Sequence, residues 1–310
     1  MTVYGRRRRR VLLGAALIGL LACVTFAPAH PRSGMIRTDA PAVVWPAQGQ
    51  GALALGNGRP AASPGQRPVA IASLAKVMTA YVTLERYPLN GPGDGFTITV
   101  SAAEAQEAAQ ARAEGQSVVA VAPGEQLTER ELLEALLIPS GNNIAEMLAD
   151  LVAGSQSGFG AQMNAQAHAL GMDHTTYNDP SGFDPITVST AADQLRVLQR
   201  ATRFSAFRQI VSMASVTLPI AGTLSNFNPL LADGYAGKTG SDSAAGGCLA
   251  FFTGVSIGGR AQTAVGVVLG QGQGSDTRAL LDAAGRAARQ MVSSVAPEAV
   301  RWRFGDSTGH

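Results

Sequence analysis

The sequence predicts an α+β fold with one main domain over residues 40–294 of the 310-residue chain. Strand-like runs occur near both ends of that range, and segments with helical periodicity lie between them. Such a separation of strands and helices is typical of α+β proteins, in which strands distant in sequence meet in one sheet.

The first elements are predicted to be short. Apolar runs at 41–45 and 51–55 flank a Gln/Gly-rich turn and predict an N-terminal β-hairpin. A helix is predicted from residue 73 to residue 87, because Pro88 cannot continue it. The runs at 96–100 and 117–121 are rich in β-branched residues and predict two more strands.

The middle of the chain is predicted to be helical. Residues 128–131 read Thr-Glu-Arg-Glu, a capping box, and open a helix with the apolar stretch 132–138. Further helices are predicted from about Asn143, over 157–170 and over 189–203, the last of which begins with a Ser/Thr cap.

The C-terminal part returns to strands and closes with a helix. Lys238 stands at the start of a predicted strand, and the runs 248–257 and 260–270 are joined by two glycines, which predicts a β-hairpin. Residues 276–294 are amphipathic and predict the last helix.

The N-terminal segment predicts an exported protein. Five arginines at 6–10 precede 17 apolar or small residues that carry no charge. Ala27-Pro28-Ala29 offers a small-residue cleavage site, which would leave residues 30–39 as a linker. A retained anchor over residues 1–29 and a lipoprotein signal at Cys23 are the two alternatives to a cleaved signal peptide.

Charge and metal-ligand content argue against two classes of function. Beyond the leader the chain has 19 basic and 22 acidic residues, a formal charge of −3, which gives no support for a nucleic-acid partner. The two cysteines, Cys23 and Cys248, and four scattered histidines form no metal-ligand cluster, so no cofactor is expected. Cys248 lies in an apolar run and is expected to be a small buried residue.

Lysine usage points to a candidate site. The chain has 22 arginines and only two lysines, Lys76 and Lys238. Arginine stays protonated at any ordinary pH, whereas a desolvated lysine can lose its proton and act as a base. Ser73 and Lys76 are three residues apart on a predicted helix and share one face. An isolated pair of this kind is more often a capping serine beside a solvated lysine, so further residues must decide.

Two further stretches complete a known set. Ser140-Gly141-Asn142 lies at a loop-to-helix junction, and Lys238-Thr239-Gly240 opens a strand. The order S-x-x-K, S-x-N, K-T-G is that of penicillin-binding proteins and class A β-lactamases. The chain resembles the low-molecular-weight penicillin-binding proteins, the serine D-alanyl-D-alanine carboxypeptidase and endopeptidase family, in four segments: 71–85, 132–149, 167–184 and 237–251.

The resemblance implies a β-lactamase/transpeptidase-like fold, in which a five-stranded antiparallel sheet is flanked by helices. A mainly helical subdomain would lie beside the sheet, with the site in the cleft between them. The implied activity is that of a D-Ala-D-Ala carboxypeptidase that trims peptidoglycan stem peptides without a cofactor. β-Lactams would be covalent inhibitors, and the place of action would be the bacterial periplasm or cell envelope.

The resemblance also implies a role for each motif residue. Ser73 would be the acyl-forming nucleophile and Lys76 its general base. Ser140 would relay a proton to the leaving amine, and Asn142 would bind the substrate's backbone amide. Lys238 would raise the local positive potential and so help to keep Lys76 neutral. The implied substrate-binding residues are Lys238, Thr239, Gly240 and Ser241.

Substrate recognition is only partly specified by the resemblance. Thr239 would bind the substrate's terminal carboxylate, and the backbone N–H groups of Ser73 and Ser241 would form the oxyanion hole. Phe227 stands where some relatives carry a basic residue, which leaves the carboxylate-binding group open. The tail at 295–310 is too short for the second domain of several carboxypeptidases, so membrane attachment, if any, would come from the N-terminus.

Three other functions compete with the carboxypeptidase. A D,D-endopeptidase would cut peptidoglycan cross-links with the same residues, and a non-catalytic wall-binding homologue would keep the fold alone. A class A β-lactamase would need a glutamate after Asn142 to activate the deacylating water, and residues 147–190 contain none. Stable acylation by penicillin is therefore expected rather than its rapid hydrolysis.

Overall fold

The computed structural model describes residues 42–89 and 93–296. The predicted export signal and linker lie outside these residues, as does the tail after Ala296. Within the described part of the chain, no helix is both long enough and apolar enough to cross a membrane.

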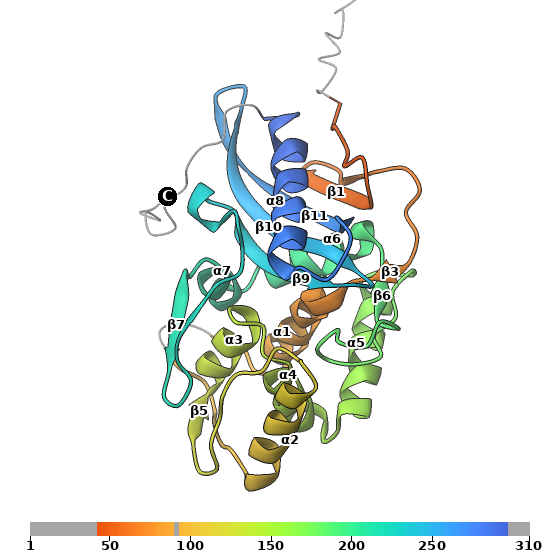
Figure 1. Ribbon diagram of the computed structural model, residues 1–310. Coiled ribbons are helices and arrows are strands. Elements are labelled where there is room, and N and C mark those ends of the chain that lie inside the picture. The colour runs from red at the N-terminus through yellow and green to blue at the C-terminus, as the bar shows by residue number, and fades with distance from the viewer. Residues whose placement is uncertain (1–41, 90–92, 297–310) are drawn as a thin grey trace, which may run out of the picture. The chain divides into compact units, whose positions relative to one another are not determined.

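The centre of the fold is a five-stranded antiparallel sheet with the strand order β2-β1-β11-β10-β9 (Figure 1). Its first long strand therefore lies beside its last one, as the α+β prediction requires. The bounds of the five strands are β1 (Gln50–Leu55), β2 (Ala61–Ala62), β9 (Ala236–Asp242), β10 (Gly246–Ile257) and β11 (Arg260–Gln271).

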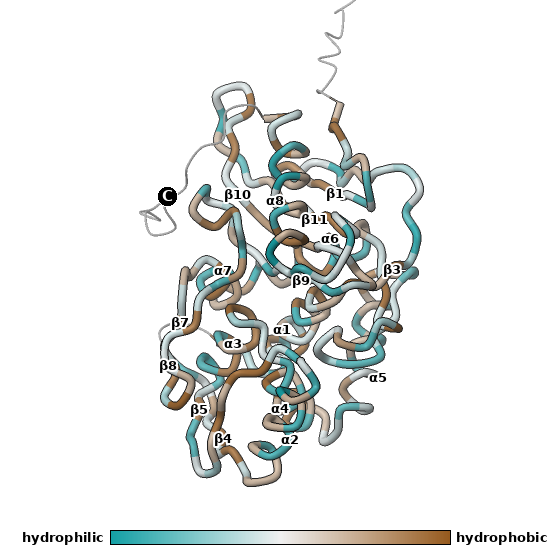
Figure 2. The backbone as a smooth tube through the Cα atoms, viewed as in Figure 1, coloured by the Kyte–Doolittle hydropathy of each residue, from teal (hydrophilic) through white to brown (hydrophobic). Residues whose placement is uncertain are grey.

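Strand β10 is apolar along most of its length because both faces of the sheet are covered. Leu249 and Phe251 pack in one buried cluster with helix α8 (Thr277–Ser293), whose ribbon lies across the sheet in Figure 1. Ala250 and Phe252, which point to the opposite face, belong to the larger core cluster with the other helices. Figure 2 shows hydrophobic stretches along β10 and β11 and hydrophilic stretches along α8.

The helices between the sheet's first and last strands form the second part of the core. Helix α1 is buried along nearly its whole length and packs against α3, α4, α5 and α6. The bounds of these helices are α1 (Ala75–Arg86), α2 (Ala102–Ala113), α3 (Glu129–Leu137), α4 (Asn142–Ala153), α5 (Gln156–Ala169), α6 (Ala191–Ala201) and α7 (Ser205–Val211). Two 3₁₀ turns, η1 (Ala72–Leu74) and η2 (Leu231–Asp233), complete the set.

Three two-stranded sheets lie outside the central one. They pair β3 (Val69–Ala70) with β6 (Val188–Ser189), β4 (Thr97–Thr99) with β5 (Gln126–Thr128), and β7 (Ser215–Leu218) with β8 (Gly222–Ser225). The predicted capping box is confirmed, because the Thr128 hydroxyl accepts from Glu131 N–H and the Glu131 carboxylate accepts from Thr128 N–H.

Two of the predicted strands are wrong. Residues 42–45 form no strand, and β1 pairs with β2 and β11 instead of with them. Residues 117–121 also form no strand, because the Asn143 side chain satisfies both backbone groups of Val119 in place of a neighbouring strand. The helices α2 and α7 and the hairpin β7–β8 were not predicted.

We expect Phe251→Ala to lower the free energy of unfolding by about 3–5 kcal/mol, the usual cost of emptying a fully buried aromatic site. Phe251 is fully buried in the central strand, and its ring lies 5.5 Å from that of Tyr235. Urea unfolding followed by circular dichroism measures the loss. The matched control is Phe227→Ala at a ring that is 51% exposed, where the change should stay within about 0.5 kcal/mol. Equal losses in both variants would contradict the packing described here.

Candidate active site

Ser73 lies in the 3₁₀ turn η1, directly before α1, rather than in the first turn of the α-helix itself. Its neighbour Ala72 has a φ of 46°, a left-handed conformation that is strained for a residue with a side chain. Within the described residues, one other non-glycine residue has a positive φ, and it is Ser140, at 66°. Both strained positions therefore fall in or beside predicted site motifs.

Lys76 is fully buried and its Nζ atom has three oxygen neighbours. The Ser73 Oγ atom is 3.1 Å away, Asn142 Oδ1 is 2.7 Å away, and the backbone oxygen of Ser181 is 2.8 Å away. The structure thus brings together the first lysine, the serine one turn before it, and the asparagine of the second motif.

These three contacts fix where the lysine lone pair points. The oxygens of Asn142 and Ser181 can only accept hydrogen bonds, so each must receive an N–H from Lys76. A charged ammonium group donates to all three oxygens, whereas a neutral amine keeps two N–H donors and one lone pair. When Lys76 is neutral, the lone pair must therefore face Ser73, whose hydroxyl can donate to it. This is the geometry that a general base for Ser73 requires.

Burial also makes the neutral form accessible. Desolvation lowers the pKa of Lys76 from 10.5 to about 7, although the carboxylates of Asp179 and Glu146 act in the opposite direction. Burial, followed by the charge of Lys76, holds the pKa of Lys238 well below its ordinary value. The amine nearest the serine can thus exchange a proton near neutral pH.

The second lysine lies in a separate set of contacts. Lys238, on β9, is buried and donates from Nζ to Ser140 Oγ at 2.9 Å and to the backbone oxygen of Thr239 at 2.8 Å. Strand β9 continues through Gly240 and the half-buried Ser241. Because Ser140 precedes α4 by two residues and Asn142 is the first residue of that helix, the two lysine clusters adjoin each other.

A tight loop at 178–184 supplies the Ser181 oxygen. The Asp179 carboxylate accepts from the backbone N–H groups of Ser181 and Phe183 and from the hydroxyls of Ser181 and Thr187. Gly182 adopts a φ of +77°, and a Cβ atom there would come within 1.9 Å of the Ala72 oxygen. A side chain cannot be accommodated at that position, so the loop can pack directly against the turn that carries Ser73.

Three residues of the site were not predicted from the sequence: Asp179, Ser181 and Gln116. Gln116 belongs to no recognisable motif. Asp179 and Ser181 fall in a segment that matched the family as a whole, without an assigned role. Gln116 Oε1 accepts from Asn142 Nδ2 at 2.8 Å, and Gln116 directly precedes residues 117–121, for which the sequence predicts a strand.

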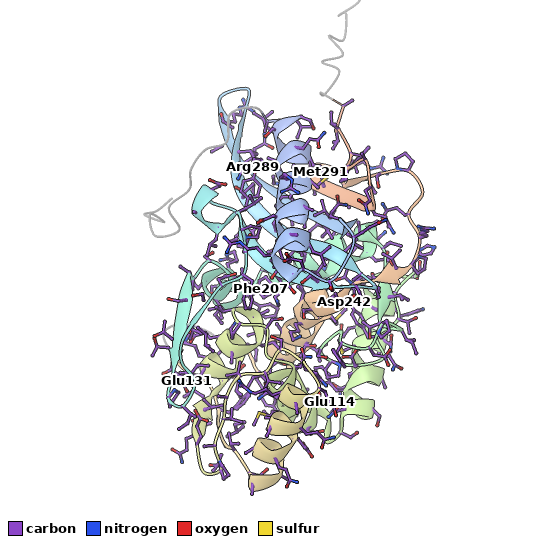
Figure 3. The ribbon with its side chains drawn as sticks, in the orientation of Figure 1. Glu114, Glu131, Phe207, Asp242, Arg289 and Met291 are labelled. Carbon is purple, nitrogen blue, oxygen red and sulfur yellow. The ribbon has the colours of Figure 1, made fainter. Side chains whose placement is uncertain are left out.

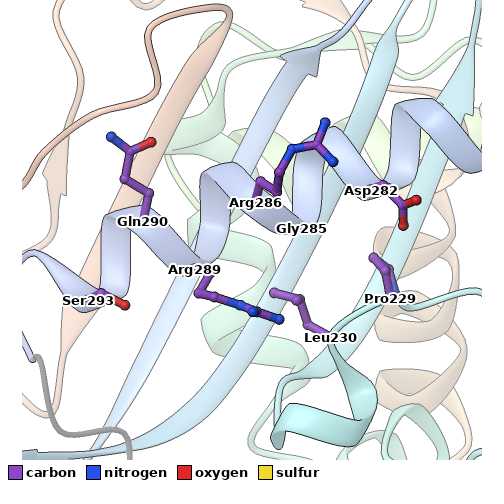
Figure 4. Close-up of a pocket in the computed structure, with 8 residues that line it drawn as sticks. All are labelled: Pro229, Leu230, Asp282, Gly285, Arg286, Arg289, Gln290 and Ser293. Carbon is purple, nitrogen blue, oxygen red and sulfur yellow. The ribbon is translucent and has the colours of Figure 1, made fainter.

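A pocket of about 370 Å³ lies elsewhere, between α8 and the segment before η2 (Figure 4). Arg289 on its rim pairs with Asp233, and none of its lining residues belongs to the motif set. The eight lining residues are Pro229, Leu230, Asp282, Gly285, Arg286, Arg289, Gln290 and Ser293.

The fold and the two lysine clusters define a class, the penicillin-interacting serine peptidases with S-x-x-K, S-x-N and K-T-G motifs. The family model for D-alanyl-D-alanine carboxypeptidases, peptidase S11, matches residues 61–271. The chain therefore belongs to this family, the low-molecular-weight penicillin-binding proteins.

Solved structures agree with the family assignment and the fold. The Streptomyces K15 DD-transpeptidase superposes with a TM-score of 0.68 at 27% identity, over 81% of this chain and 98% of that one. A penicillin-binding protein homologue from Mycobacterium tuberculosis superposes with a TM-score of 0.64 at 26% identity, over 85% of this chain and 99% of that one.

Curated relatives are matched over part of their length. The D-alanyl-D-alanine carboxypeptidase DacC of Escherichia coli is 33% identical over 62% of this chain and 46% of its own. A D-alanyl-D-alanine endopeptidase of Pseudomonas aeruginosa is 34% identical over 46% of this chain and 42% of its own. The chain thus spans about half of the length of these relatives or less.

We expect the protein labelled with ¹³Cε-lysine to give two lysine signals, because the chain has two lysines. The Lys76 signal should titrate with a midpoint near 7, and it should be absent from Lys76→Arg. Ser73→Ala is the matched control: its Lys76 midpoint should stay far below 10.5, because burial is the largest cause of the shift. A Lys76 midpoint near 10.5 would contradict the desolvated site.

Proposed function

We propose that this protein is a serine-type D-Ala-D-Ala carboxypeptidase that trims peptidoglycan stem peptides through an acyl-enzyme on Ser73. The observation that carries the proposal is the contact set of Lys76, a buried amine whose lone pair must face the Ser73 hydroxyl when the amine is neutral. Family membership supports the same chemistry.

The first half of the reaction forms the acyl-enzyme. Lys76 takes the Ser73 proton as Oγ attacks the carbonyl carbon of the penultimate D-Ala, and the peptide bond to the last residue breaks. The proton taken by Lys76 passes through Ser140, which accepts from Lys238 in the structure, to the leaving D-Ala amine, so Lys76 is neutral again. Backbone N–H groups of Ser73 and Ser241 would stabilise the oxyanion, each such donor being worth roughly 3 kcal/mol.

The second half releases the trimmed stem peptide. A water molecule attacks the ester carbonyl while neutral Lys76 accepts its proton, and Lys76 returns that proton to Ser73 Oγ as the ester bond breaks. Lys238, Thr239, Gly240 and Ser241 would line the substrate along β9, with Thr239 binding the terminal carboxylate. Asn142 donates one of its two Nδ2 hydrogens to Gln116, so the other can reach a substrate oxygen.

The protein would act in the bacterial cell envelope, where peptidoglycan stems are accessible. The support for export is the basic and apolar segment at 1–29, which lies outside the described residues and would be either cleaved or retained as the point of membrane attachment.

We expect fluorescent penicillin to label the protein covalently, with Ser73→Ala unlabelled and the exposed-serine control Ser225→Ala labelled at the wild-type rate. Lys76→Arg should slow acylation by about 10²–10⁴-fold, because arginine stays protonated. Below pH 7 the wild-type rate should fall as pH falls, since protonation removes the lone pair of Lys76, whose pKa is about 7. Gel fluorescence over time measures these rates. Full labelling of Lys76→Arg would refute the base, and an unlabelled wild-type protein would favour a non-catalytic wall-binding homologue.

A D,D-endopeptidase is the second candidate, because relatives from Pseudomonas aeruginosa and Escherichia coli carry that name at 34% and 29% identity. We expect incubation with a stem pentapeptide to release free D-Ala faster than incubation with cross-linked muropeptides releases monomers. Chromatography with mass detection identifies both products, and Ser73→Ala is the blank. Cleavage of cross-links alone would exclude the carboxypeptidase in favour of the endopeptidase.

A further inference from the structure

A chain of hydrogen bonds runs from the protein surface to Ser73 through two amide side chains. Glu114 Oε2 lies 3.4 Å from Gln116 Nε2, and Gln116 Oε1 lies 2.8 Å from Asn142 Nδ2. Asn142 Oδ1 then lies 2.7 Å from Lys76 Nζ, which lies 3.1 Å from Ser73 Oγ. We propose that Gln116 is a positioning residue, which fixes the direction of the Asn142 amide and thereby aims the Lys76 lone pair at Ser73.

The direction of the Asn142 amide matters because its two ends have opposite effects on a neutral amine. With Oδ1 facing Lys76, the asparagine accepts an N–H and leaves the lone pair for Ser73. With Nδ2 facing Lys76, the asparagine would donate into the lone pair itself. The serine would then have no base, although the shape of the site would be almost unchanged.

Gln116 supplies the contact that distinguishes these two directions. Its Oε1 atom can only accept, so it favours Nδ2 of Asn142 on its own side and leaves Oδ1 on the side of Lys76. Gln116 is itself an amide that can turn round, and the carboxylate of Glu114 beside its Nε2 atom favours the observed direction. Glu114, labelled in Figure 3, also accepts from Gln110.

The backbone around Gln116 is held firmly in place. Asn142 donates from its backbone N–H to Ser117 O, and the Ser117 hydroxyl donates to Pro139 O. The side chain of Asn143 then bonds both backbone groups of Val119, each at 3.0 Å. Because the loop is held along several residues, a substitution at Gln116 changes one side-chain contact and leaves the loop in register.

The inference rests on the proposed function and deepens it, so the test compares three substitutions in the penicillin acylation assay. Gln116→Glu keeps an acceptor towards Asn142, whereas Gln116→Met keeps the volume without any polarity. Gln110→Met is the matched control, because Gln110 also donates to Glu114 but is not one of the residues hydrogen-bonded to the Asn142 side chain. Each rate is measured across pH to its plateau at high pH.

We expect the plateau acylation rate of Gln116→Met to fall by about ten-fold, the effect of losing one orienting hydrogen bond. Gln116→Glu should retain the wild-type plateau within about two-fold, and Gln110→Met should not change it. A merely structural role predicts the reverse order, because methionine fills the space and a glutamate adds repulsion beside Glu114. Equal rates in all variants, or a loss in Gln116→Glu as large as in Gln116→Met, would overturn the proposal.

The titration of ¹³Cε-labelled Lys76 gives a second readout that does not depend on catalysis. The titratable groups that interact electrostatically with Lys76 are Asp179, Glu146 and Lys238, and all three stay the same in every variant. Gln116→Glu should raise the Lys76 midpoint, since it adds a negative charge. Gln116→Met should lower it, since a turned Asn142 favours the neutral amine. Absence of any labelling by penicillin would refute the proposed function alone, whereas unmoved Lys76 midpoints would refute the role of Gln116.

Discussion

The active-site arrangement depends on keeping one amine out of water beside one hydroxyl. Lys76 is buried on a helix whose neighbours are nearly all apolar, and two pure acceptors occupy its N–H groups. Desolvation without these acceptors would leave buried donors unpaired, which is costly. Acceptors without desolvation would stabilise the ammonium form. Both conditions together give a lysine that is hydrogen-bonded in either protonation state. In its neutral state the lone pair of the amine faces Ser73.

Holding those acceptors in place requires strain elsewhere in the chain. Ala72 and Ser140 both adopt left-handed backbone conformations, each of which costs about 1–3 kcal/mol for a non-glycine residue. Ala72 lies in the turn before α1 and Ser140 in the loop before α4, so the strained positions are next to the segments that carry Ser73 and Asn142. The large buried core around α1 offsets this cost, so the geometry of the site is set by the packing of the whole domain.

The sequence predicted those features that local chemistry determines. The Thr128 capping box, the β10–β11 hairpin and the closing helix depend on nearby residues, and all three are present. The strand at 117–121 failed because the partner of Val119 is a side chain 24 residues away, which periodicity cannot reveal. Helix α2 has a capping box at Ser101 and Glu104, a signal that could have been found, but it buries only two residues and lacks a clear apolar stripe.

The candidate site shows the same division between chemistry and placement. The scarcity of lysine drew attention to Lys76 and Lys238, whereas the full set with Ser73, Ser140 and Asn142 came from the resemblance to the penicillin-binding motifs. The groups that control the amine are less visible: one is a backbone oxygen, at Ser181, and another is an uncharged surface-side amide, at Gln116. Their effect comes from which atom faces inward. The sequence determines which atom faces inward only through the complete fold. The orientation of the base Lys76, unlike its identity, therefore becomes visible only in the three-dimensional structure.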